Sequence, residues 1–173
     1  MKRHTIITLA ATLVCAATVH AQDNPLSTGI KSVYTIAKTN VLKSAEKMPE
    51  ENYSFKPTPD VRSFGEVLGH VADAQYLFCG TVKGEEKKSD VAATKTSKAD
   101  ITAALKDAFA YCDGVYNSMK DEAAADKVKF FGADRPKLAL LSFNAAHTME
   151  HYGNIVTYMR LKGLVPPSSE SSR

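Results

Sequence analysis

Two histidines four residues apart are the residues whose spacing most directly suggests chemistry. His147 and His151 lie in a segment with helical periodicity, and at about 100° per residue they differ by only about 40° around the helix axis. Both rings therefore lean to the same side, and such a pair can bind one cation. The alternative is a pair of hydrogen-bonded core histidines, and the spacing alone leaves both interpretations open.

A third histidine points to the same kind of site. His70 lies inside another helical segment, between the apolar residues Leu68 and Val71, so we expect it to face the interior too. If the two helices are neighbours, three neutral imidazoles converge and leave one or more coordination positions for water. Imidazole nitrogen is a good ligand for several transition metals. From the pattern alone, a divalent metal site and three hydrogen-bonded core histidines both remain open. If a metal binds, Zn, Ni and Fe are the candidates.

The segment from His147 to His151 also matches His-x-x-Glu-His, the inverted zinc-protease signature. Those proteases are far larger and take another acidic ligand well downstream, whereas Glu170 is the sole acid after His151. The protease interpretation fails for lack of a ligand. Glu150 is close to the predicted site by helical spacing; it either orients a histidine or accepts a proton there, or it is a solvated surface glutamate.

The N-terminal segment is typical of a secretory signal peptide over residues 1–21. Lys2 and Arg3 precede an apolar run over residues 6–19, which is about the length of the central region of such peptides. Small residues then place the predicted cut after Ala21. The run is shorter than the roughly 20 apolar residues that a spanning helix needs. The alternative is an N-terminal membrane anchor that is never removed.

Cleavage after Ala21 would lower the net charge of the protein. The 173-residue chain has a formal net charge of +3, and removal of Lys2 and Arg3 lowers it to +1. So small a net positive charge argues against a nucleic-acid partner, since nucleic-acid-binding proteins usually concentrate basic residues on one face. We therefore expect a secreted or periplasmic protein with no stable membrane anchor after cleavage. Its partner is a small-molecule substrate or ligand of unidentified structure, and a homodimer is compatible with the sequence.

Helical periodicity recurs along the remaining chain, residues 22–173, and strand-like alternation of useful length does not. The predicted helices cover about residues 27–47, 63–80, 97–122 and 136–162. A long polar connection with two prolines separates the first two helices, and a charged solvated loop over residues 83–98 separates the next two. Residues 166–173 form a flexible tail. Four helices of this size predict an all-α four-helix bundle.

Two cysteines remain after the predicted cut, Cys79 in the second helix and Cys112 in the third. In an oxidising compartment they are expected to form a disulfide, whereas in the cytosol both would be small core residues. Shared metal coordination is disfavoured because Cys79 is nine residues, about 13 Å along a helix, from His70.

Two motifs resemble the DinB-like superfamily. The first runs from Tyr53 to His70, and the second runs from His147 to Ser169 and includes the Gly-x-x-Pro-Pro pattern of residues 163–167. The resemblance covers residues 26–169. It implies an up-down-down-up bundle of four helices, with a divalent metal on a histidine triad that falls on His70, His147 and His151. Characterised relatives imply metal-assisted transfer or isomerisation that uses low-molecular-weight thiols.

These observations lead to three functional hypotheses. The first is an exported metal-dependent hydrolase or transferase of unidentified substrate. The second is a non-catalytic bundle that binds metal or a small ligand, and the third is a structural bundle whose histidines belong to the core. Helical proximity suggests Asp73, Asn144 and Tyr158 as neighbours of the site.

Overall fold

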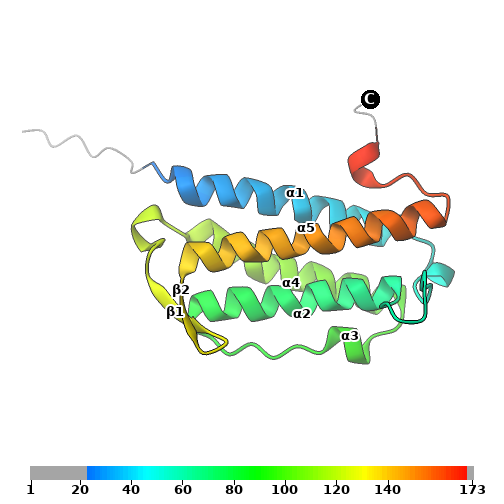
Figure 1. The fold of residues 1–173 in the computed structure, drawn as a ribbon, viewed down its shortest axis with the longest axis horizontal. Helices are drawn as coiled ribbons and strands as arrows, with labels where there is room; N and C mark the ends of the chain where they lie inside the picture. Colours follow the sequence, from blue (N-terminus) through cyan, green and yellow to red (C-terminus); the bar gives the residue numbers. More distant parts are fainter. Residues whose placement is uncertain (1–22, 171–173) are drawn as a thin grey trace, which may run out of the picture.

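The computed structural model describes residues 23–170, so the predicted signal peptide and its cut after Ala21 lie outside the described residues. Four long helices form a bundle, with a small hairpin at one end (Figure 1). The long helices are α1 (Pro25–Lys47), α2 (Phe64–Lys83), α4 (Lys98–Ser118) and α5 (Lys137–Leu161). The short elements are η1 (Glu50–Asn52), α3 (Val91–Thr94), η2 (Asp121–Ala123), β1 (Lys127–Phe130), β2 (Ala133–Pro136) and η3 (Pro167–Ser169). The predicted all-α four-helix bundle is confirmed.

The helices follow an up-down-down-up arrangement. In Figure 1, α1 and α5 run in one direction, and α2 and α4 run in the other. Each of α1 and α2 packs against both α4 and α5, so α1 and α2 occupy opposite corners of the bundle. Because the consecutive helices α2 and α4 are parallel, the chain over residues 84–97 must return along the whole bundle, as Figure 1 shows. The bundle thus has a second long connection besides the predicted one over residues 48–63.

A continuous apolar core fills the space between the four long helices. Its centre holds the stacked rings of Tyr34 and Tyr116, whose centroids are 3.9 Å apart. Cys79 of α2 and Cys112 of α4 form a buried disulfide with a Cα–Cα distance of 5.5 Å, which confirms the predicted pairing. Other fully buried core side chains include Phe64, Leu68, Ile101, Leu105, Phe109, Leu141, Ile155 and Met159.

The start of α2 is specified locally. Ser63 and Glu66 match the capping-box pattern Ser-x-x-Glu and form it: the Glu66 amide donates to the Ser63 hydroxyl at 3.2 Å, and the Ser63 amide donates to the Glu66 carboxylate at 2.6 Å. The preceding connection is closed onto this helix by the Gly65 amide, which donates to the Tyr53 carbonyl at 2.8 Å. The first turn of α2 is therefore held in place seven residues before His70.

The connection over residues 84–97, named here the strap, is anchored to α2 by Asp73. This carboxylate accepts hydrogen bonds from the Ser89 hydroxyl at 2.6 Å and from the amides of Val91 and Ala92 at 2.8 and 3.1 Å. Gly69 lies beneath the strap, where a Cβ would be 2.6 Å from the Ala92 Cα. Residues 83–88 are exposed, as predicted for a solvated loop, whereas residues 89–92 pack against α2 and lead into one short helix. This close approach requires glycine at position 69.

The third helix and the linker after it differ from the sequence-based prediction. The third helix ends at Ser118 rather than near residue 122, because Asp121 turns back to accept hydrogen bonds from the Leu26 and Ser27 amides at the start of α1. The linker forms an antiparallel hairpin of two four-residue strands. Its alternation extends only over Val128 and Phe130, too short a pattern to identify a strand from sequence alone.

The expected flexible tail also differs in the structure. The Tyr152 hydroxyl donates to the Ser168 hydroxyl at 2.7 Å, and the Ser168 amide donates back at 2.9 Å. Lys47 forms an ion pair with Glu170 at 2.6 Å. Residues 166–170 are thus held against α1 and α5. Among the described residues, no helix is both long enough and apolar enough to cross a membrane.

The disulfide should contribute measurably to stability, because it closes a loop with a sequence separation of 33. Replacing both Cys79 and Cys112 by alanine should lower the free energy of unfolding by about 3–4 kcal/mol in the chain-entropy model. Urea denaturation of the oxidised protein and of the double variant measures this difference. Wild-type protein under reducing conditions should behave like the double variant, and equal midpoints with and without reductant would contradict the prediction.

The contact between Gly69 and the strap gives a second prediction. Gly69→Ala should destabilise the protein by about 1–3 kcal/mol, because the added methyl overlaps the backbone of Ala92. Gly114→Ala is the matched control: it lies inside α4 with no atom within 4 Å of the added Cβ, and it should stabilise by about 0.5–1 kcal/mol. Thermal unfolding of both variants checks the opposite signs, and a neutral Gly69→Ala would show that the strap moves freely.

Candidate metal centre

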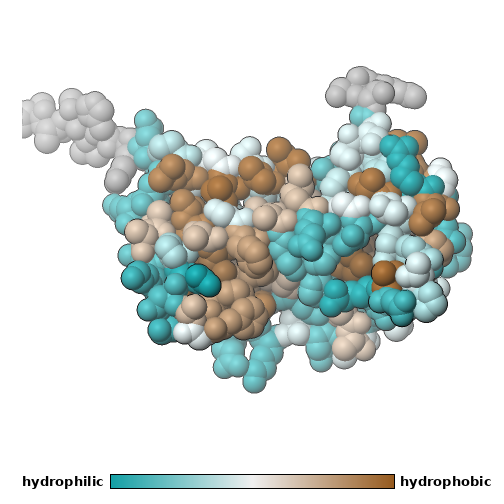
Figure 2. Space-filling model, viewed as in Figure 1, coloured by the Kyte–Doolittle hydropathy of each residue, from teal (hydrophilic) through white to brown (hydrophobic). Residues whose placement is uncertain are grey.

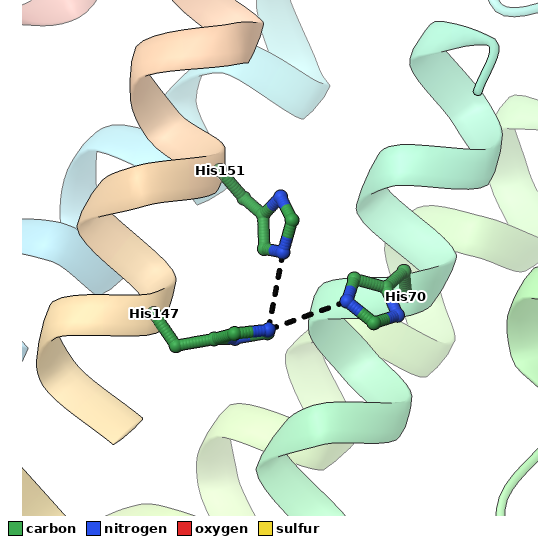
Figure 3. A group of neighbouring side chains, drawn as sticks. All are labelled: His70, His147 and His151. Atoms are coloured by element: carbon green, nitrogen blue, oxygen red, sulfur yellow. Dashed lines mark hydrogen bonds between the residues drawn. The ribbon is translucent and has the colours of Figure 1, made fainter. Parts of the chain in front are cut away.

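The three predicted histidines come together between two neighbouring helices. His70 projects from the middle of α2, and His147 and His151 project from successive turns of α5. Figure 3 shows the three rings pointing toward one another. The Nε2 atom of His147 lies 3.3 Å from Nε2 of His70 and 3.1 Å from Nε2 of His151. One nitrogen from each residue falls within a sphere small enough for a shared ion.

Buried polar contacts between α2 and α5 fix the register that makes this convergence. Gln75, one and a half turns after His70, donates through Nε2 to the Thr148 hydroxyl at 3.0 Å. Its Oε1 accepts from the Asn144 amide at 3.0 Å. All three side chains are fully buried. Because breaking either bond would leave a buried polar group without a partner, sliding α5 along α2 is costly, and His70 stays opposite His147 and His151.

The spacing of the nitrogens fits a transition-metal ion. Two ligands at the Zn–N distance of about 2.0–2.1 Å in a tetrahedral site are themselves about 3.3–3.4 Å apart. The two pairs that include His147 are close to this, at 3.1 and 3.3 Å, and all three ligand atoms lie within 4.8 Å of one another. Hydrogen bonds alone do not satisfy the cluster. A neutral imidazole Nε2 either donates or accepts, so His147 Nε2 cannot donate to one neighbour while it accepts from the other. A cation between the three lone pairs removes this conflict.

The surroundings keep the imidazoles neutral. Burial lowers the pKa of His70, His147 and His151, and for His151, which is 8% exposed, it lowers the pKa to about 4. The positive charge of Arg62 acts in the same direction on all three rings. Neutral imidazole is the form that coordinates metals. At neutral pH each ring is therefore uncharged and has one nitrogen with a lone pair that can coordinate.

Outer-shell contacts also orient one of the rings. The Nδ2 atom of Asn154 lies 3.4 Å from Nδ1 of His151, so that the amide donates to Nδ1. A flip of the amide would place its oxygen there instead. With the oxygen toward His151, Nδ1 is the protonated nitrogen and Nε2 is free to coordinate. Nδ1 of His147 is buried and has no hydrogen-bond partner among the described residues. Asn154 is thus the described side chain within hydrogen-bond distance of His151 Nδ1, and only the flipped amide leaves Nε2 of His151 free to coordinate.

The neighbours suggested by helical proximity have other roles. Asp73 holds the strap, Asn144 belongs to the buried contacts with Gln75, and the Tyr158 hydroxyl donates to the Arg62 carbonyl at 2.7 Å. Glu150 is exposed, and its charge favours protonation of His70 and His147 from a distance. No described carboxylate hydrogen-bonds to any of the three histidines.

Two residues near the site escaped the sequence analysis. Asn154 follows His151 by three positions, so the i, i+3 rule for helices could have identified it. Arg62 carries no such signal, because it lies in the connection before α2 and reaches the site only through the tertiary fold. Among the described residues it forms no ion pair with a carboxylate. Its backbone is instead fixed through the hydrogen bond from Tyr158.

Two hollows lead to the histidines from opposite ends of the cluster. One has a volume of about 940 Å³ and reaches His70 and His147 from the side of the hairpin. The other, about 600 Å³, is lined by Arg62, His151, Asn154 and Tyr158 among others. The cluster is therefore accessible to ligands although each ring is at least half-buried by its neighbours.

Comparisons with known proteins agree with this architecture. The family model of the DinB superfamily matches residues 34–155. The protein YjoA of Bacillus subtilis (strain 168) is 25% identical over 128 residues, which cover 72% of this chain and 82% of YjoA. A DinB-like protein from Bacillus cereus ATCC 10987 superposes with a TM-score of 0.71 at 20% identity, over 81% of this chain and 95% of that one. The crystal structure of YjoA gives 0.68 at 21% identity, over 83% and 99% of the two chains.

The lowered pKa of His151 predicts how stability depends on pH. In metal-free protein the folded state keeps His151 neutral down to about pH 4, whereas the unfolded state binds a proton below about pH 6.5. Stability from this residue is complete above pH 6.5 and decreases as the pH falls toward 4. Between pH 7 and pH 5 the loss should be about 2 kcal/mol. Urea denaturation in the presence of a chelator measures it.

The control for this experiment is His151→Asn, which removes the titrating group and leaves the carboxylates unchanged. Its free energy of unfolding should decrease less than that of the wild type between pH 7 and pH 5. Parallel pH profiles for the two proteins would show that burial of His151 does not shift its protonation.

Proposed function

The chain belongs to the DinB superfamily, and from this membership and its histidine geometry we propose that it binds one divalent metal ion. The ligands are the Nε2 atoms of His70, His147 and His151. The convergence of these three atoms, with His147 Nε2 at 3.3 and 3.1 Å from the others, is the observation that carries the proposal. Zn, Ni and Fe remain the candidate ions, since imidazole binds all three.

An ion held by three neutral imidazoles keeps an open coordination position, where it lowers the pKa of a bound water or thiol and polarises a substrate. The side chains around the ion prepare the histidines and admit the substrate. Burial and Arg62 keep the imidazoles unprotonated, and Asn154 orients the His151 ring. Two hollows let a substrate approach the ring nitrogens. This arrangement supports a metal-dependent hydrolase or transferase acting on a small molecule.

A second candidate is a non-catalytic bundle that binds metal or a small ligand. The observation in its favour is that no described carboxylate contacts the three histidines, so a general base next to the site has to come from the substrate or from solvent. Turnover of activated esters or transfer of thiols by metal-loaded protein, lost in His147→Ala, distinguishes the enzyme from the binder.

We further propose that the protein is exported, with cleavage after Ala21. The buried disulfide between Cys79 and Cys112 supports this location, because disulfides persist mainly in oxidising compartments. The signal-like composition of residues 1–21 points the same way. N-terminal sequencing of protein recovered from the periplasm or the medium tests the cleavage site, and a cytosolic product that begins at Met1 would contradict it.

Metal content is the direct test of the proposed site. Protein purified without a histidine tag should contain about one equivalent of divalent metal by elemental analysis, or take it up from added Zn²⁺ or Ni²⁺. His147→Ala should lose most of this binding, because it removes the ligand between the other two. Glu150→Gln is the matched control on the same helix and should retain the metal. A wild-type protein that is empty and ignores both added ions would refute the proposal.

A further inference from the structure

Resting on this metal site, we propose that the hollow on the hairpin side binds the apolar, aromatic-sized portion of a small ligand whose polar head group coordinates the metal. We call this hollow the aromatic groove. Its apolar lining consists of Leu77, Phe78, Phe131 and Phe143, and His70 and His147 lie at its inner end. Phe131, at the tip of the hairpin, is the residue that we assign to ligand recognition.

The groove has the size and shape of a small-molecule site. Its volume of about 940 Å³ lies within the range of roughly 300–1,000 Å³ typical of ligand pockets. It is bounded by α2, by the start of α5, by the hairpin and by the strap, and it ends at two of the three metal-binding histidines. A ligand whose head reaches the metal therefore has its remainder inside this groove rather than on an open surface.

Contacts between aromatic rings connect the histidines to the hairpin tip, with Phe130 behind the groove lining. The ring of Phe78 lies 5.5 Å from that of His147 and 5.3 Å from that of Phe130, between centroids. Phe130 in turn lies 4.3 Å from Phe131. The ring centroid of Phe143 lies 6.5 Å from that of His147 and 5.5 Å from that of Phe78. Rings at these spacings pack well against a further apolar or aromatic group.

Much of this aromatic surface is exposed. Phe131 is 86% exposed, Phe143 55% and Leu77 42%, although helical periodicity assigns Leu77 to the core. In Figure 2, hydrophobic colours gather over the hairpin and the adjoining helices on the face shown. A contiguous apolar surface beside a polar centre is a common mark of a binding site. Here its continuity with the histidines argues for a small ligand rather than a protein partner.

The backbone at the hairpin tip gives independent support. Phe131 and Gly132 form the two-residue turn with φ of 47° and 79°. Positive φ at both positions is typical of the type I′ turn, in which Asn-Gly is the preferred pair. A phenylalanine in the left-handed region is unfavourable, and this one has little buried contact to offset the cost. Asparagine would be more favourable than phenylalanine at this turn position. We therefore attribute the presence of Phe131 to contact with a bound ligand.

The wall of the groove that faces the phenylalanines does not favour a ligand of either charge. Residues 85–90 of the strap carry both acidic and basic side chains along the groove. Apolar contact therefore dominates recognition in the groove, and the polar part of the ligand is left for the metal. The predicted ligand class is a small molecule with a metal-coordinating head and an aryl or similarly bulky apolar substituent.

Hydroxamic acids test this inference because their head group coordinates metals while the substituent varies. Co²⁺-loaded protein should bind 4-phenylbutanohydroxamic acid roughly 10-fold more tightly than acetohydroxamic acid, as measured by titration of the visible Co²⁺ absorption. Phe131→Asn should reduce this preference to about 2-fold or less and leave the acetohydroxamate affinity unchanged. The same variant should melt at an equal or higher temperature, because asparagine suits the turn.

Leu161→Asn is the matched control, since Leu161 is 58% exposed at the far end of α5 and lies outside the groove. It should keep the preference for the aryl hydroxamate. Equal affinities of the two hydroxamates for the wild type, or an unchanged preference in Phe131→Asn, would overturn the groove assignment while leaving the metal site intact. Failure of the wild type to take up Co²⁺ would overturn the proposed function and this inference together.

Discussion

The packing of α5 against α2 is the constraint on which the candidate site depends. A metal site of three imidazoles needs ligands from both helices, and a shift of one helix by a single turn would move them apart by about 5.4 Å. The buried hydrogen bonds of Gln75 with Asn144 and Thr148 oppose such a shift. The disulfide between Cys79 and Cys112 holds α2 against α4 on its other side. Helix register, more than any single contact at the site, thus determines where His70 lies.

The electrostatics of the site follow from the same burial. Desolvation disfavours protonation of each ring, and the nearby charge of Arg62 adds to this effect. A cluster that excludes protons but presents three lone pairs is suited to a soft or borderline cation. Arg62 itself has no carboxylate partner within the described chain. The histidine cluster is therefore bordered on one side by a hollow that carries Asp60 and Arg62, and on the other side by the aromatic groove.

The strap and the hairpin, which lie outside the four long helices, form the walls around the histidine cluster that the helices alone would not provide. The strap covers α2 because Gly69 permits close contact with Ala92 and because Asp73 anchors the return chain. The hairpin presents Phe131 beside the groove. Both segments are also tied to the core: the strap contributes Val91 to it, and the hairpin packs Val128 and Phe130 against it. The long helices thus hold the three histidines, whereas the connections shape the access to them.

The sequence by itself determined the helices, the capping box of Ser63 and Glu66, the disulfide partners and the identity of the three histidines. Each of these depends on local periodicity or on a small inventory of residue types. Only the tertiary structure decided the strap along α2, the hairpin and the turn at Asp121. It also placed Arg62, Asn154 and Phe131 around the site. Such features arise from contacts between residues far apart in the chain, and a short strand or a lone arginine has no period that reveals its neighbours.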